Sequence, residues 1–187
     1  MLKTAYCSNV HAGANLQETR QNLAEFSCRV RDLVSPNLDE MGIGLWLSAQ
    51  SARELVADES ARRNFSEFLS QNRLDPWTFN GFPHGNFHQP VVKKRVYQPT
   101  WRDTARLDYT CDLVELILEL STSDYLSIST LPLDWGEPAV PSDSLEQCAR
   151  QLQVLTKLMH RKLQETGKLV AICIEPEPGC AMIPAAP

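Results

Sequence analysis

Short apolar runs alternate along the chain with longer stretches in which apolar residues recur at helical spacing. This alternation is typical of repeated strand–helix units. The apolar runs predict five strands, over residues 4–10, 42–48, 77–82, 125–131 and 168–174. Several runs are continuously apolar, as expected for strands of a parallel sheet that helices cover. The pattern therefore predicts an α/β protein with a parallel sheet.

The segments between the predicted strands carry signals for the starts and ends of helices. Three pairs have the spacing of a capping interaction, namely Asn15 with Glu18, Ser51 with Glu54, and Thr100 with Asp103. Gly167 stands where a left-handed residue commonly ends a helix. About 20 residues from Pro83 to Arg102 lack a helical or strand pattern, and a loop of that length is usually functional or mobile.

The order of elements fits either a doubly wound open sheet or a (β/α)₈ barrel. No GxGxxG follows the first predicted strand and no P-loop is present, which disfavours nucleotide-binding open sheets. Polar residues cluster directly after the strands, where barrel enzymes place their chemistry, but a closed barrel typically takes about 250 residues. We therefore expect residues 1–187 to be the amino-terminal part, about five β/α units, of one TIM-barrel domain whose carboxyl-terminal half is missing.

Composition excludes several classes of function. The net charge of −5 disfavours broad binding to nucleic acid, and with the few histidines it disfavours an endonuclease. The apolar runs are too short for a membrane span, and the amino terminus has no secretory pattern, so we expect a cytoplasmic protein. None of the six cysteines forms a CxxC pair. Cys28, Cys111 and Cys148 fall on the apolar stripes of predicted helices, where we expect small buried hydrophobes.

Several motifs together resemble one known family. The run at residues 80–88, Asn-Gly-Phe-Pro-His-Gly-Asn-Phe-His, resembles the NGFPxGxFH motif of the EboE "metabolite traffic protein" family. Further matching stretches are Val92 to Trp101, Arg106 with Tyr109 and Thr110, residues 128–133 (ISTLPL) and residues 174–180 (IEPEPGC). The resemblance runs from about residue 5 to about residue 180. It departs from the family at His84, where a Tyr is usual, and after Cys180.

The resemblance implies a fold and a broad role. The EboE family is similar to the xylose-isomerase-like (sugar phosphate isomerase/epimerase) TIM barrels, so the chain is expected to share that barrel. It is also expected to act in making or moving a small metabolite. In the related barrels a Glu at the end of the fifth strand commonly binds a divalent metal, which implies that role for Glu175.

The carboxylates after the last predicted strand are the first candidates for chemistry. Glu175 stands where a strand end would direct its carboxylate into a barrel mouth, and hard cations such as Mn²⁺ and Mg²⁺ prefer such oxygens; Zn²⁺ is the third metal considered. Glu177 is a second candidate metal ligand, or an acid–base partner of Glu175. The alternative for both is a solvated acid in a proline-rich turn.

Other candidates follow the earlier strands. His88 is a candidate metal ligand, general base or hydrogen-bond donor to a substrate hydroxyl, and His11 a candidate substrate-binding residue. Asn80 could bind a hydroxyl group, and Trp46 could either stack on a sugar ring or pack in the core. Lys93 belongs to a short basic cluster suited to a phosphate or carboxylate group. The alternative for His88 is a loop histidine hydrogen-bonded to backbone carbonyl groups, and the alternative for Lys93 is a solvated loop residue.

These candidates leave three hypotheses. The first is a metal-dependent isomerase or epimerase acting on a small polyhydroxylated metabolite, with Glu175 and His88 as catalytic residues. The second is a non-catalytic binding or escort protein for a biosynthetic intermediate, which uses the same residues. The third is an inactive fragment, because five units would leave the site incomplete.

Overall fold

The computed structural model describes residues 4–34, 40–88, 93–135 and 141–181. Its centre is a sheet of five strands, which are β1 (Ala5–Cys7), β2 (Met41–Leu45), β3 (Leu74–Asn80), β4 (Tyr125–Thr130) and β6 (Leu169–Ile174). The strands lie in the sheet in the order in which they occur in the chain, and every neighbouring pair is parallel. The predicted α/β class with a parallel sheet is confirmed.

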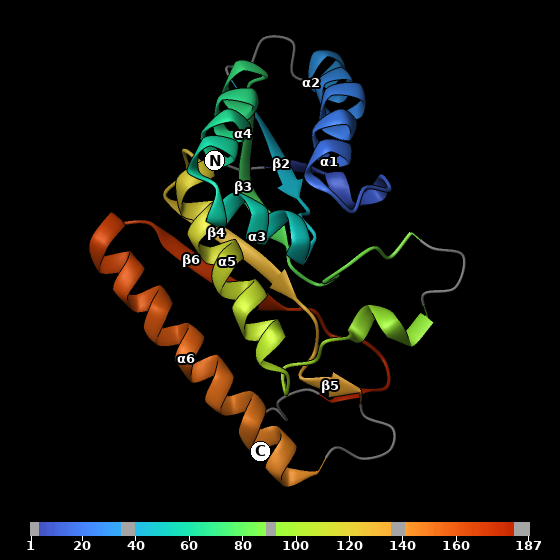
Figure 1. Cartoon of the computed structure of the whole chain (residues 1–187), viewed down its shortest axis with the longest axis vertical. Helices are drawn as coiled ribbons and strands as arrows, with labels where there is room; N and C mark the ends of the chain where they lie inside the picture. Colours follow the sequence, from blue (N-terminus) through green and yellow to red (C-terminus); the bar gives the residue numbers. More distant parts are fainter. Residues whose placement is uncertain (1–3, 35–39, 89–92, 136–140, 182–187) are drawn as a thin grey trace.

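Helical segments connect the strands. After β1 come the 3₁₀ helix η1 (Ser8–Val10), α1 (Leu16–Asn22), the π-helical η2 (Leu23–Ser27) and α2 (Cys28–Val34). The later connections contain α3 (Ala49–Ala57), α4 (Glu59–Gln71), the 3₁₀ helix η3 (Lys93–Tyr97), α5 (Thr104–Leu120) and α6 (Ser142–Thr166). Figure 1 shows α4 and α5 across the sheet and α6 alongside β6, and these helices contact the strands that they cover.

The predicted helix starts are partly confirmed. Asn15 caps α1, since its side chain accepts a hydrogen bond from the Glu18 N–H over 2.9 Å. The prediction for Ser51 is wrong, because Ser48 is the N-cap of α3 and accepts from the Ser51 N–H. Asp58 then ends α3 and caps α4, dividing the one helix that the pattern predicts into two. Gly167 ends α6 with a φ of 74°, as expected.

Three strands differ from the prediction by three residues at one boundary. The first predicted strand, residues 4–10, is a strand only over Ala5–Cys7, and the chain then turns into η1. The second, predicted over residues 42–48, ends at Leu45. The third begins at Leu74 rather than at residue 77. It pairs with β2 through a register shift between Gly42 and Gly44, and such a bulge is invisible to a pattern of strict alternation.

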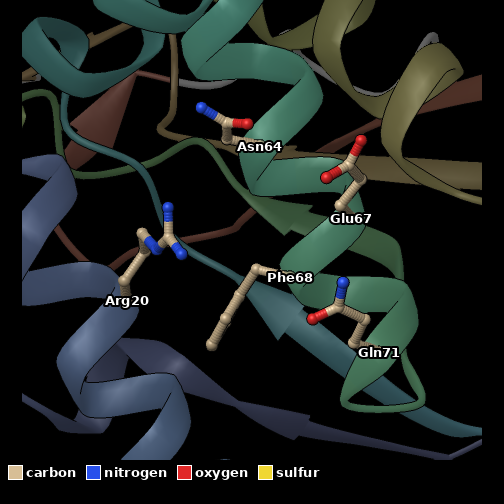
Figure 2. A pocket seen from close by; sticks show the side chains of 5 residues that line it. All are labelled: Arg20, Asn64, Glu67, Phe68 and Gln71. Carbon is tan, nitrogen blue, oxygen red and sulfur yellow. The ribbon is translucent and has the colours of Figure 1, made fainter.

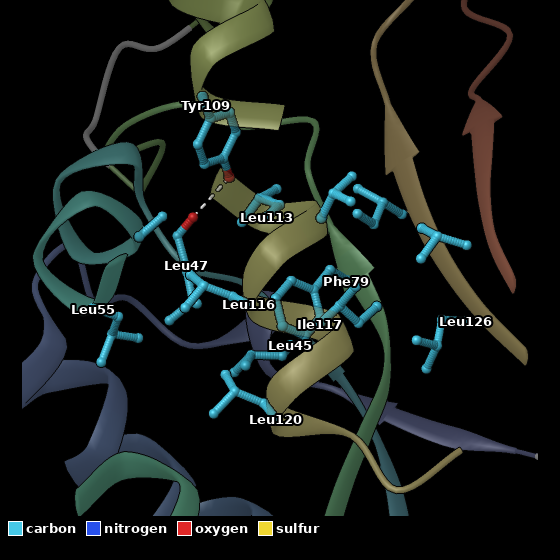
Figure 3. Close-up of a cluster of buried hydrophobic side chains, with 14 of the residues drawn as sticks. Leu45, Leu47, Leu55, Phe79, Tyr109, Leu113, Leu116, Ile117, Leu120 and Leu126 are labelled. Carbon is cyan, nitrogen blue, oxygen red and sulfur yellow. Dashed lines mark hydrogen bonds between the residues drawn. The ribbon is translucent and has the colours of Figure 1, made fainter. Parts of the chain in front are cut away.

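The main core lies between the sheet and α5. Figure 3 shows Leu113, Leu116, Ile117 and Leu120 of this helix beside Phe79 of β3, and all of these side chains are buried. The described part of α5 has buried residues on most of its circumference, which is typical of a helix enclosed by other elements. Apolar burial at this scale is the main stabilising term of the fold.

The two faces of the sheet differ in chemistry. In β4, Leu126 and Ile128 are fully buried on the side of the helices, whereas Ser127 and Ser129 alternate with them and are partly exposed. The hydroxyls of Thr78 and Ser127 lie 2.8 Å apart, so β3 presents Thr78 to the same side. We call this second side the open face. Within the described residues, β1 and β6 are the outer strands of the sheet.

A small second sheet lies beyond the carboxyl ends of the main strands. It consists of β5 (Asp134–Trp135) and β7 (Cys180–Ala181), which pair antiparallel and were not predicted from the sequence. In Figure 1 the arrowheads of β2 and β4 point toward the side where β5 and the long loop lie. No helix in the described ranges combines the length and the apolar character that crossing a bilayer requires.

Candidate functional site

The carboxyl ends of the five parallel strands form the candidate site. Because parallel strands end on the same side, the residues after them are brought to one end of the sheet, as the sequence predicts. Ser8 follows β1 and Trp46 follows β2, and they are in direct contact, since the Ser8 hydroxyl accepts from the Trp46 N–H over 2.9 Å. The Glu175 N–H donates to the Thr130 carbonyl oxygen over 2.9 Å, which places Glu175 beside the end of β4.

Two histidines lie at the β1–β2 side of this end. His88 lies near Trp46, with ring centroids 6.1 Å apart, and the charge on His88 contributes to lowering the pKa of His11. Phe87 packs edge-on against Trp46 with ring centroids 4.9 Å apart. We call His11, Trp46, Phe87 and His88 the two-histidine cluster. The structure thus brings together three of the predicted site residues.

Aromatic contacts fix His11 in place. Its Nε2 lies 2.8 Å from the Tyr6 hydroxyl, and its ring stacks on Phe26 with centroids 3.9 Å apart. Partial burial is the main reason why the pKa of His11 is lowered, and nearby Glu25 opposes this. His11 is therefore held mainly as a neutral imidazole near neutral pH, a state that can accept as well as donate a hydrogen bond.

Trp46 occupies a packing position. Its side chain is only 2% exposed and its Nε1–H donates to the Pro83 carbonyl oxygen over 2.9 Å. A ring buried this deeply has little surface on which a sugar could stack, so the geometry favours the core-packing alternative. Its hydrogen bond nevertheless ties the end of β2 to the loop that carries His88.

His88 has an unused ring nitrogen. Its backbone N–H donates to the Asn86 side chain over 3.0 Å, but its Nδ1 is buried without a hydrogen-bond partner among the described residues. Buried polar atoms are nearly always paired, so an unpaired one at a candidate site indicates a position where a ligand can be bound. This observation supports His88 as a site residue.

Asn80 lies in a row of polar residues on the open face. Register pairs Asn80 of β3 with Ser129 of β4, and Ser129 with Cys173 of β6. The Asn80 side-chain oxygen accepts from the Phe82 N–H over 3.0 Å, which leaves its amide N–H groups for another acceptor. One row lower, Thr78 pairs with Ser127. The carboxyl half of the open face thus presents hydroxyl, amide and thiol groups.

A second group of side chains gathers around Tyr97 of η3. Its ring packs against Phe82 with centroids 5.4 Å apart, and its hydroxyl is hydrogen-bonded to the thiol of Cys180. Burial, followed by the negative charge of Glu177, raises the pKa of both Tyr97 and Cys180. We call Phe82, Tyr97, Glu177 and Cys180 the Tyr97 cluster; it joins three motifs that are far apart in the chain.

The remaining predicted residues are placed as follows. Within the described residues, no hydrogen bond or ion pair links Glu175 to His88, although the sequence analysis puts both at one site. Lys93 is the first residue of η3, and its side chain lies outside what the structure describes. His84, disfavoured by the sequence, packs edge-on against Tyr109 with ring centroids 5.1 Å apart.

The described residues lack the ligand set of a metal site. The described part of the chain contains no group of three or more His, Cys, Asp and Glu side chains that could hold a metal ion together. Glu175 and Glu177 lie two residues apart after β6, but without a third such ligand in the described residues. The described donors therefore do not by themselves fit a divalent metal centre, which normally takes several protein ligands.

Two buried residues of α5 contribute to this end of the molecule in a way that sequence reasoning missed. Arg106 and Tyr109 both donate hydrogen bonds to backbone carbonyl oxygens of the loops after β2 and β3. The motif that Arg106 and Tyr109 form with Thr110 could have drawn attention to them. The sequence pattern, however, predicts only that they lie on a helix, not what they contact. Their partners lie in loops whose course the sequence does not specify.

The hollow drawn in Figure 2 lies elsewhere. It measures about 300 Å³ and is lined by Arg20 of α1 together with Asn64, Glu67, Phe68 and Gln71 of α4. The Arg20 guanidinium lies 4.9 Å from the centre of the Phe68 ring. Three of the four lining residues of α4 belong to its carboxyl-terminal half. That half leads into the amino end of β3, so this hollow is away from the candidate site.

Comparison with known proteins adds no relative. Searches against family models, curated proteins and solved structures return no match. The resemblance to the EboE family therefore stays a prediction from the motifs.

Proposed function

We propose that this chain contributes the ligand-binding end of a xylose-isomerase-like (β/α) barrel that acts as an isomerase or epimerase on a small polyhydroxylated metabolite. The observation that carries the proposal is the polarity of the open face. Near the carboxyl ends of the strands this face presents Asn80, Ser129 and Cys173 in one register row. These groups can donate hydrogen bonds to, or accept them from, the hydroxyls of such a ligand.

The strand order supports the barrel. In doubly wound sheets the strand order reverses at a switch point, whereas here each strand lies beside its predecessor. With right-handed crossovers, an order without reversal puts all the helices on one face and leaves the other for the interior of a barrel. We propose that further β/α units pair with the outer strands β1 and β6 and complete it.

The size of the side chains supports an interior that holds a ligand. A filled barrel interior is dominated by bulky branched residues, yet the carboxyl half of the open face carries small polar side chains. The amino half is bulkier, since Tyr125 and Leu169 are register partners there and Trp77 lies where a side chain on Gly42 would point. Bulky side chains would thus close the barrel interior at the amino ends of the strands. Small polar side chains would leave space for a ligand at the carboxyl ends.

His88 and Glu175 are the proposed catalytic residues. The Nδ1 of His88, which has no hydrogen-bond partner among the described residues, can take or give a proton on a bound hydroxyl or carbonyl group. Glu175 and Glu177 would be metal ligands only with others from beyond the described residues, so no step is assigned to a metal. His11 would hold a substrate hydroxyl from beside His88, and Lys93 would hold a phosphate or carboxylate group.

A second candidate function is binding without turnover. It is favoured by the absence of a three-residue metal-binding group from the described part of the chain. A binding or escort protein would use the same polar row and would be indifferent to chelators.

NMR measurements of sugar interconversion distinguish the isomerase or epimerase from the binding protein. A panel of pentoses, hexoses and their phosphates would be incubated with the protein, with and without Mn²⁺, Mg²⁺ or Zn²⁺ and with EDTA. The proposal expects turnover that Glu175→Gln removes, while Glu146→Gln on the exposed part of α6 leaves it intact. Turnover that EDTA abolishes would show that ligands from beyond the described residues complete a metal site at Glu175. Binding by calorimetry without turnover would establish the escort function, and neither binding nor turnover would contradict both.

A further inference from the structure

A single buried guanidinium holds both ends of the loop that carries His88. Arg106, in the first turn of α5, is fully buried. Its Nη1–H donates to the Gly81 carbonyl oxygen over 2.8 Å and its Nε–H to the Pro99 carbonyl oxygen over 2.9 Å. Gly81 comes before His88 in the chain and Pro99 after it. The segment between them is thus closed by one side chain.

Tyr109, in the next turn of α5, attaches the end of β2 to the same helix. The Tyr109 hydroxyl lies 2.7 Å from the Leu47 carbonyl oxygen, to which it donates, and 3.2 Å from that of Pro83. The same Pro83 oxygen accepts from Trp46. Arg106 lies over the Tyr109 ring, with 5.5 Å between the guanidinium carbon and the ring centre. The two side chains therefore form one unit beneath the loops.

The burial of Arg106 is costly, which sets it apart from an ordinary helix residue. A buried cation is normally paired with a carboxylate, but within the described residues Arg106 forms no ion pair, and its Nη2 has no hydrogen-bond partner. Burial lowers its pKa to about 10, so it stays charged at neutral pH. Its hydrogen bonds to the two carbonyl oxygens are then charge-assisted and stronger than neutral ones.

We propose that Arg106 is a positioning residue, which sets the place of His88 beside His11 by tying Gly81 and Pro99 to α5. The inference rests on the proposed function in one respect: it assumes that a ligand binds at the carboxyl ends of the strands. The placement of His88 is itself measurable without a ligand, so failure of one idea is distinguishable from failure of the other.

The imidazole signals of the four histidines in NMR spectra test the inference. In Arg106→Gln we expect the His88 and His11 signals to shift by more than their line widths, while the signal of exposed His160 on α6 stays in place. Amide exchange at Ala49, whose N–H donates to the His84 carbonyl oxygen, should accelerate by about tenfold or more, because hydrogen bonds to a charged group are lost. Amides of the β4–β6 ladder should exchange as in the wild type.

Arg62→Gln is the matched control. Arg62 also donates to backbone carbonyl oxygens, those of Leu55 and Val56, and is mostly buried, but it lies on α4. Unchanged His88 signals in folded Arg106→Gln, or equal shifts in Arg62→Gln, would overturn the inference. If Arg106→Gln does not fold, Arg106→Lys decides, because one ammonium cannot reproduce the fork of the guanidinium. Displaced His88 signals in that variant support the inference, and wild-type signals refute it.

Discussion

The N–H of Gly81 donates to the carbonyl oxygen of Ser129 over 2.9 Å, and the backbones are so close there that no side chain would fit at Gly81. This contact carries β3–β4 pairing one residue beyond Asn80 and Ser129, which are register partners. It therefore fixes where the motif after β3 leaves the sheet. The first prediction concerns this glycine.

Gly81→Ala should destabilise the protein by about 1–3 kcal/mol, the usual cost of overpacking. The new Cβ would lie 2.7 Å from the Ser129 carbonyl oxygen and 3.0 Å from side-chain carbons of Ile128 and Leu113, in a region without room to yield. Gly85→Ala in the same motif is the control, because among the described residues, its chain neighbours aside, no atom lies within 4 Å of a Cβ there. Urea unfolding of the two variants measures the difference, and equal midpoints would contradict the described packing.

The Tyr97 cluster predicts a change in thiol reactivity. The negative charge of Glu177 is among the causes that raise the pKa of the Cys180 thiol, and only the thiolate reacts with alkylating reagents. Glu177→Gln should therefore lower that pKa and increase the rate of alkylation of Cys180 by iodoacetamide at pH 8. Mass spectrometry of the peptide that contains Cys180 gives the rate. Exposed Cys173 is the internal reference, and a parallel change at Cys173 would mean that the effect is not local.

His84 should make stability depend on pH. Burial, followed by the charges of Arg106 and Arg53, lowers its pKa from 6.5 to about 4. The unfolded chain therefore binds a proton at His84 at a higher pH than the folded protein does. The free energy of unfolding should fall as the pH decreases from 6.5 toward 4, and the contribution of His84 is fully present above that range.

His84→Gln should remove this part of the pH dependence. Urea midpoints at pH 7.5 and pH 5 measure it, and the difference between the two midpoints should be smaller in the variant than in the wild type. His11 titrates in the same direction but is present in both proteins, so it cancels in the comparison. His160→Gln on the exposed side of α6 is the control. An unchanged pH dependence in His84→Gln would mean that His84 is more accessible than described.

The parts of the fold that could be predicted are those that depend on local pattern. Apolar runs of strand length gave all five strands of the main sheet, because a strand covered by helices must be apolar over most of its length. The boundary at Leu74 and the start of α3 at Ala49 were missed. At the start of α3 both Ser48 and Ser51 have the side chain of an N-cap. Ser48 is the N-cap in the structure, where its hydroxyl also donates to the Ala14 carbonyl oxygen, a distant contact that a local pattern does not contain.

The candidate site was predictable only as far as topology determines it. Parallel strands bring the residues that directly follow them to one end of the sheet, which is why the sequence predicts His11 and His88 there. The position of His88 beside Trp46 also depends on loop contacts, such as the hydrogen bond from Trp46 to Pro83. The bond between Tyr97 and Cys180, and those from Arg106 to Gly81 and Pro99, depend on how long segments fold back on the sheet. No local spacing encodes these contacts. Nor could the sequence decide whether Glu175 and His88 are in contact, because two residues at the same end of a sheet need not touch.

The opposite end of the sheet predicts a purely structural effect. Asp75 near the start of β3 is buried, and its carboxylate accepts hydrogen bonds from the hydroxyls of Ser121 and Ser123, over 2.5 and 2.6 Å, and from the Thr122 N–H over 3.2 Å. These bonds attach the end of α5 to β3. Asp75→Ala would remove these three hydrogen bonds to a buried charged group and should destabilise the protein by about 2–4 kcal/mol.

Asp124→Ala is the control for this prediction, because Asp124 is an exposed acid in the same connection and its removal should change stability by less than about 0.5 kcal/mol. Thermal unfolding followed by circular dichroism measures both variants. Because barrel folds keep residues for stability at the amino ends of the strands and those for function at the carboxyl ends, Asp75→Ala should lower the melting temperature without shifting the His88 signal in the folded protein. A shift of that signal would show that the two ends of the sheet are coupled, and a wild-type melting temperature would show that the three bonds to Asp75 contribute nothing.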